Sequence, residues 1–131
     1  MMINNTIALF GEAERGEYRK PYFFDNIPSL AENLGNPPPE SKGLHFAVQA
    51  LLYKQKLLFF RVQEEGFSLE DYYSGLNLLR TIDIDLSIRA IYLPGVGNGE
   101  IINEVIPFCN KKNSILIMTE RDFYDFVTHG G

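Results

Sequence analysis

The sequence of 131 residues contains one cysteine, Cys109, and no tryptophan. A single cysteine excludes an intrachain disulfide and any metal site built from several thiolates. Neither of the two histidines has a second metal ligand at a suitable spacing, so the sequence predicts no metal site. The first residues, MMINNTIALF, lack the basic start and continuous apolar core of an export signal. Together these absences favour a reducing, cytoplasmic location.

Basic residues are fewer than acidic ones: the sequence has 12 lysines and arginines and 17 aspartates and glutamates. A formal net charge of −5 argues against sequence-independent binding to DNA or RNA, which requires a surplus of cations. The sequence has no apolar run long enough to cross a bilayer. We therefore expect neither nucleic acid nor membrane as a partner.

The composition is that of an ordinary globular protein, with 45% hydrophobic and 22% charged residues. The length suits one domain with one substantial core, so we expect residues 1–131 to form a single α/β domain. Four short apolar runs read as buried strands: Thr6–Phe10, Leu57–Val62, Ser87–Leu93 and Ser114–Met118. Each is followed by a segment with helical spacing of its apolar residues.

The predicted helices cover residues 28–34, 44–53, 69–82, 101–109 and 121–127. Ser68 and Asp71 form a capping-box pattern before the third of these, and Pro107 predicts that the fourth is kinked or short. Strand and helix alternate in the order β-α-β-α-β-α-β-α. This order predicts a small three-layer sandwich with a mostly parallel four-stranded sheet, of the Rossmann or flavodoxin type.

In such a fold the loops after the strands meet at one edge of the sheet, where ligands bind. The loops predicted there are 11–17, 63–67, 94–100 and 119–122. We expect a small-ligand-binding or sensory module with its site at this edge, and a nucleotide-like or sugar-like ligand is favoured. The candidate ligand-binding residues are Gly11, Arg15, Glu64, Gly95, Gly97 and Asn98.

The run PGVGNGE has a second interpretation, in which its glycines turn the chain and allow close packing. It lacks a phosphate-binding lysine and the full dinucleotide fingerprint, and Glu100 already complements the helix dipole. Phosphate cradling is therefore the weaker interpretation, whereas a neutral sugar hydroxyl remains compatible with Glu100.

Carboxylates in these loops suggest catalysis as another alternative. Glu12 and Glu100 are the candidate catalytic residues of an enzyme acting on an N-glycosidic or phosphoester bond. Alternatively, Glu12, Glu14, Glu64 and Glu65 supply oxygens of the kind that bind Mg²⁺, although their spacing is not diagnostic. The sequence identifies no cofactor.

Gly95-Val96-Gly97-Asn98-Gly99-Glu100 resembles the loop of nucleoside 2-deoxyribosyltransferase-like proteins, and FGEAERGE follows the first strand at a position where they contact substrate. The resemblance implies a small α/β fold and attack of a glutamate on an anomeric carbon. It is confined to these two loops, the glutamate is displaced by one position, and it does not establish membership.

A third interpretation is an interaction module without a small ligand. Tyr18, Tyr22, Phe23 and Phe24 cluster beside the first charged loop, and NPPPES (36–41) forms a rigid connector. These aromatic residues, in the cluster 18–24, predict a contact surface for a homodimer or another protein partner.

Overall fold

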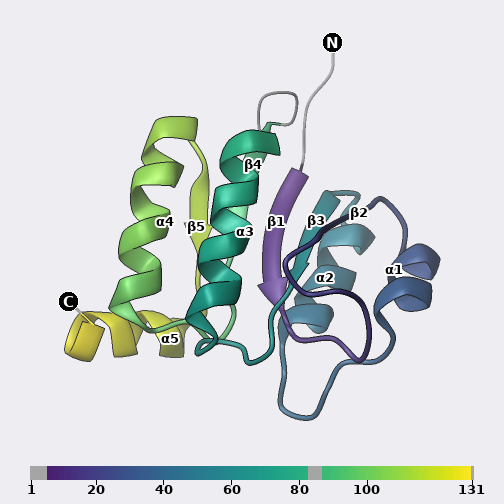
Figure 1. The fold of residues 1–131 in the computed structure, drawn as a ribbon, viewed down its shortest axis with the longest axis horizontal. Coiled ribbons are helices and arrows are strands. Elements are labelled where there is room, and N and C mark those ends of the chain that lie inside the picture. Colours follow the sequence, from purple (N-terminus) through teal and green to yellow (C-terminus); the bar gives the residue numbers. More distant parts are fainter. Residues whose placement is uncertain (1–5, 83–86, 131) are drawn as a thin grey trace.

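The computed structural model describes residues 6–82 and 87–130, which form a five-stranded sheet flanked by helices (Figure 1). The strand order is β2-β3-β1-β4-β5. β1, β3, β4 and β5 run parallel, and β2 runs antiparallel to β3. The strands are β1 (Thr6–Gly11), β2 (Pro21–Phe24), β3 (Lys56–Arg61), β4 (Ile88–Tyr92) and β5 (Ile115–Ile117). The predicted α/β class with a mostly parallel sheet is confirmed.

The sequence-based prediction missed β2, which lies within the aromatic cluster 18–24. This strand pairs with the outer edge of β3, and Phe24 is buried in the core while Phe23 is 47% exposed. Such alternation is typical of an edge strand with one face on the core. The aromatic cluster is thus divided, because part of it fills the core and part of it faces solvent.

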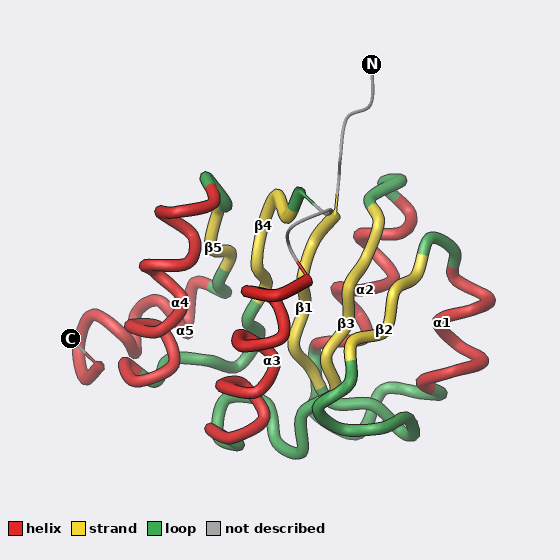
Figure 2. Tube along the Cα trace, turned by 45° about the horizontal axis from the view of Figure 1, so that its top comes forward, coloured by secondary structure: helices red, strands yellow, loops and turns green. Residues whose placement is uncertain are grey.

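Helices cover both faces of the sheet, as Figure 2 shows from a second direction. α1 (Ile27–Leu34) and α2 (Gly43–Leu52) pack on one face, mainly over β1 and β3. α3 (Leu69–Ile82) and α4 (Gly99–Lys112) pack on the other face. α5 (Glu120–Asp125) continues into the π-helical turn η1 (Phe126–Gly130) and lies below α4 and β5 in Figure 1. No helix in residues 6–82 and 87–130 is long and apolar enough to cross a membrane.

Two expectations about helix ends are not met. α4 is not short, because it continues beyond Pro107 to Lys112, and Phe108 and Cys109 pack into the core on the far side of the proline. The capping box before α3 does not form. Instead, the Ser68 hydroxyl bonds the backbone of Glu64, and the Asp71 carboxylate accepts a hydrogen bond from the Gln63 N–H.

Gly75 lies in the middle of α3, where glycine weakens a helix by about 1 kcal/mol relative to alanine. The structure explains its presence, because a Cβ atom there would lie 2.3 Å from the Phe10 ring of β1. Phe10 in turn stacks between Phe60 and Tyr72, with ring centroids 4.8 and 5.4 Å apart. The glycine therefore lets α3 approach the sheet closely.

Candidate functional site

The order of the parallel strands places the expected binding crevice between β1 and β4. The chain adds β3 on one side of β1 and then β4 on the other, so the direction of winding reverses at this point. Ligands of open α/β sheets bind at such a switch point, outside the carboxyl ends of the strands. The four loops after the parallel strands do meet at this edge, as predicted from the sequence.

Protein backbone fills the centre of this edge. Gly66, in the loop after β3, approaches Gly95, in the loop after β4. A Cβ atom on Gly66 would lie 2.1 Å from the carbonyl oxygen of Gly95. Gly66 has a φ of +92° and Gly95 has a φ of +83°, both in the left-handed region that favours glycine. The two loops therefore pack directly against each other across the end of β1.

The buried carboxylate of Glu65 holds three chain segments together at this edge. Its oxygens accept hydrogen bonds of 2.9 Å from the backbone N–H groups of Glu12, Lys42 and Gly43. The last two belong to the start of α2, whose N-cap residue, Lys42, makes no side-chain capping bond. The Glu65 charge thus caps α2 from another loop and complements its dipole.

Glu12, a candidate catalytic residue, is tied to Glu65 in return. Its carboxylate accepts a 2.9 Å hydrogen bond from the Glu65 N–H, so each glutamate bonds the backbone of the other. The buried Tyr72 hydroxyl accepts a 2.7 Å hydrogen bond from the Gly66 N–H beside them. Burial, reinforced by the charges of Glu65 and Glu12, raises the pKa of the Tyr72 phenol. Tyr72 therefore stays neutral and serves as a hydrogen-bonding support.

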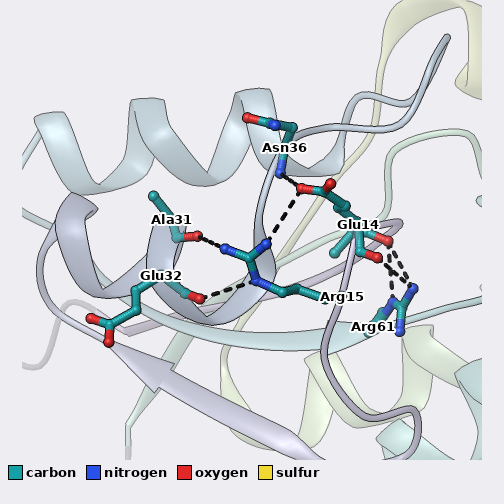
Figure 3. Close-up of polar contacts among 7 residues, drawn as sticks. Glu14, Arg15, Ala31, Glu32, Asn36 and Arg61 are labelled. Carbon is teal, nitrogen blue, oxygen red and sulfur yellow. Dashed lines mark hydrogen bonds and ion pairs between the residues drawn. The ribbon is translucent and has the colours of Figure 1, made fainter.

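Arg15, predicted to bind a ligand, contacts the end of α1 (Figure 3). Its guanidinium donates to the carbonyl oxygens of Ala31 and Glu32 at 3.3 and 3.2 Å and forms an ion pair with Glu14. Cations at a helix C-terminus satisfy its last carbonyl groups. Arg15 thereby fixes the first loop to α1.

Glu14 and Arg61 complete the fixing of the same loop. The Glu14 carboxylate accepts a 2.9 Å hydrogen bond from the Asn36 N–H, and the Arg61 guanidinium donates to several carbonyl oxygens of residues 13–16 (Figure 3). Arg61 also stacks on the Tyr18 ring, 4.3 Å from its centroid. The loop after β1 is therefore held by the Arg61 side chain of β3 and by bonds from its own Glu14 and Arg15 to backbone groups in and after α1.

The glycine loop after β4 turns the chain and packs against α5. The Gly95 N–H donates a 2.8 Å hydrogen bond to the buried carboxylate of Asp122. A Cβ atom on Gly97 would lie 2.9 Å from the Cβ of Asp125. The Asn98 side chain caps α4 by accepting a 2.7 Å hydrogen bond from the Glu100 N–H. These contacts are those expected of the turning-and-packing interpretation.

The remaining predicted residues are dispersed along the edge. Gly11 touches the backbone of Gly43, since a Cβ atom on Gly11 would lie 2.7 Å from the Gly43 Cα. Glu64 is exposed. Glu100 is exposed in the first turn of α4. The pKa of Tyr73 on α3 is raised mainly by desolvation of its phenol and secondly by the negative charge of Glu100. Glu100 and Glu12 have separate partners, and neither lines the hollows described below.

Neither metal binding nor attack by a thiol is supported by the described residues. Within the described residues, no set of three or more His, Cys, Asp or Glu side chains is placed to hold a metal ion. Burial raises the pKa of the Cys109 thiol to about 11, so this thiol is protonated at neutral pH and unsuited to nucleophilic attack. Cys109 is a residue of the core on the α4 side of the sheet.

A polar hollow of about 440 Å³ lies at the carboxyl edge, beside the start of α3. Arg19 forms part of its wall through a 3.4 Å ion pair with the buried carboxylate of Asp71. Gln63 and Ser68 add an amide and a hydroxyl, and the Phe67 ring is 71% exposed at its rim. The sequence analysis did not identify Arg19 or Phe67, because nothing in their spacing marks them.

A second hollow, of about 400 Å³, lies on the sheet face opposite α4. Its floor is formed by Ala90 and Tyr92 of β4 and by Ile115 and Ile117 of β5, and α2 forms one wall. Ile115 is 61% exposed. Strands of parallel sheets are normally covered on both faces, so this part of the sheet is an exception. We call it the open face of β4–β5.

Comparison of the sequence and structure with known proteins adds no relative: no protein-family profile, curated protein or solved structure matches. The resemblance of the two loops to nucleoside 2-deoxyribosyltransferase-like proteins therefore remains a prediction.

Proposed function

We propose that the protein is an interaction module that binds an acidic, amphipathic helix of a partner protein on the open face of β4–β5. The observation that carries the proposal is the 61% exposure of Ile115 on β5, whose other face packs against α4. On the side of the hollow, α2 covers Tyr92 of β4 through Phe46. A helix is the element that fills this position in a three-layer α/β fold. The hollow beside α2 offers it an apolar floor.

Charge around the open face defines the chemistry of the partner. Within the described residues, the segments α2 to β3 (43–61), β4 (88–92) and β5 (115–117), which supply nearly all of its lining, contain no aspartate or glutamate, although the whole chain has 17. Exposed cations among or next to its lining residues are Lys54, Lys56 and Arg89. An apolar surface with a cationic border complements a helix with an apolar stripe flanked by carboxylates.

The proposal predicts selective binding of acidic helices. A synthetic helical peptide with a leucine and phenylalanine stripe flanked by glutamates is expected to bind at least about tenfold more tightly than the same stripe flanked by lysines. Ile115→Glu is expected to abolish binding, because it places a carboxylate in the apolar floor. Isothermal titration calorimetry measures both effects, with Ile106→Glu on the exposed side of α4 as the control variant. Equal affinity for the two peptides would contradict the proposal.

A small-ligand site at the carboxyl edge is the second candidate function, and the polar hollow around Arg19 favours it. An exposed aromatic ring beside an arginine, an amide and a hydroxyl suits a nucleotide-like or sugar-like molecule. Such a ligand at millimolar concentration is expected to raise Tm by at least about 2 °C in the wild type and not in Phe67→Ser. Thermal-shift measurements with nucleosides, nucleotides and sugar phosphates test this, and no shift with any of them would remove the candidate.

A further inference from the structure

We infer that the helix bound on the open face of β4–β5 is supplied by a second copy of this chain, through its C-terminal segment 120–128. The inference rests on the proposed function and names the partner. It predicts a homodimer in which each copy places α5 and the start of η1 on the open face of the other.

The C-terminal segment has the chemistry that the open face requires. Its inward side is used within the monomer, since Asp122 binds the Gly95 N–H and Phe126 packs against the core. Its outward side carries Phe123, Tyr124 and Val127, which are 55%, 64% and 54% exposed. Val127 follows Phe123 by four residues and Tyr124 by three, the spacings at which helical side chains are neighbours. The segment therefore presents an apolar stripe that the monomer leaves uncovered.

Charge on the same segment complements the border of the open face. Glu120 and Asp125 are exposed beside the apolar stripe, and the segment carries one cation, Arg121. The open face is bordered by lysines and Arg89 and has no carboxylate in its lining residues. The contact thus pairs an acidic helix with a basic border, even though each whole chain is negatively charged.

The position of the segment suits a reciprocal arrangement. α5 begins three residues after β5 ends, and it lies below β5 in Figure 1. The donor helix therefore starts close to the carboxyl end of a strand that forms part of the acceptor face. A two-fold axis near β5 would place each helix on the other copy's open face and close the assembly as a dimer.

The experiment is sedimentation equilibrium of the full chain over a range of concentrations. The wild type is expected to dimerise. Ile115→Glu on the acceptor face and the double variant Phe123→Ser/Tyr124→Ser on the donor helix are each expected to weaken association at least about tenfold. Ile106→Glu, on the exposed side of α4, is expected to associate like the wild type. Circular dichroism establishes that each variant is folded.

Mixing the two interface variants tests reciprocity. The Ile115→Glu copy keeps its donor helix and the double variant keeps its acceptor face, so the mixture is expected to form heterodimers through one remaining contact. Two open faces packed directly together would give no such rescue, and the double variant would still dimerise. That outcome, or loss of association in Phe23→Glu but not in Ile115→Glu, would overturn the inference.

Failure of this inference is distinguishable from failure of the proposed function. A wild type that stays monomeric at all concentrations but binds the glutamate-flanked peptide, with loss of binding in Ile115→Glu, would overturn the second copy as partner and leave the binding face standing. A monomer that binds neither peptide would overturn both.

Discussion

Replacing Glu65 by alanine is expected to lower the free energy of unfolding by about 4 kcal/mol. Its carboxylate accepts hydrogen bonds from three backbone N–H groups, in the loop after β1 and at the start of α2. The variant leaves these donors without a partner in a site that is only 9% exposed. It also removes the charge that complements the dipole of α2. Urea denaturation followed by circular dichroism measures the change.

Glu64 provides the matched control for this prediction. It is the adjacent glutamate, it is exposed, and Glu64→Ala is expected to change stability by less than about 0.5 kcal/mol. Glu65→Gln keeps the shape of the side chain but turns one acceptor into a donor facing a backbone N–H, so we expect an intermediate loss. Equal stability of Glu65→Ala and Glu64→Ala would show that the carboxylate is not the structural centre of this edge.

Gly66→Ala is expected to destabilise the protein by more than about 3 kcal/mol. The new Cβ would lie 2.1 Å from the Gly95 carbonyl oxygen, which belongs to the backbone and cannot rotate away. The φ of +92° at Gly66 adds strain for any residue with a Cβ atom. The two loops would have to separate, and the Gly66 N–H would lose its bond to the Tyr72 hydroxyl.

Gly97→Ala is the comparison variant. A Cβ atom there would meet the Cβ of Asp125 at 2.9 Å, and Asp125 is an exposed residue at the end of α5 rather than a buried backbone group. We expect a loss of about 1 kcal/mol, measured by the same urea denaturation. If Gly66→Ala were no more destabilising than Gly97→Ala, the direct packing of the two loops would be wrong.

The Glu65 prediction follows from a wider property of the carboxyl edge. Backbone N–H groups of neighbouring segments donate hydrogen bonds to several carboxylates there: Glu12, Glu14, Glu65, Asp71 and Asp122. Parallel strands leave loop backbone at this edge that cannot pair within the sheet, and side-chain acceptors satisfy it. Acidic residues at strand ends can therefore support the fold without performing chemistry.

The sheet was predictable from the sequence because its central strands are continuous apolar runs. TIALF and LLFFR have few polar residues, as expected of strands buried on both faces, and the alternation with helices indicates parallel order. β2 was missed since four residues with three aromatics show no pattern that separates an edge strand from a loop.

The details of the site depend on features that spacing does not encode. Glu64 and Glu65 are adjacent and chemically identical, and the sequence does not show that Glu65 is buried against the start of α2 while Glu64 is exposed. The open face of β4–β5 was equally hidden, because Ile115 and Ile117 have the composition of buried strand residues. Its exposure depends on α5, which is held at the carboxyl edge by the bond from the Gly95 N–H to Asp122 rather than packing across the sheet.

Isoleucine methyl NMR tests most directly whether the open face of β4–β5 is the binding surface. The full chain is titrated with the glutamate-flanked peptide while its methyl signals are recorded. The account predicts that the methyl signals of Ile7, Ile115 and Ile117, which line the hollow, shift with peptide concentration. The signals of Ile88 and Ile101, buried in the core on the α4 side, should stay in place. Shifts confined to other isoleucines, or no shift at saturating peptide, would contradict it.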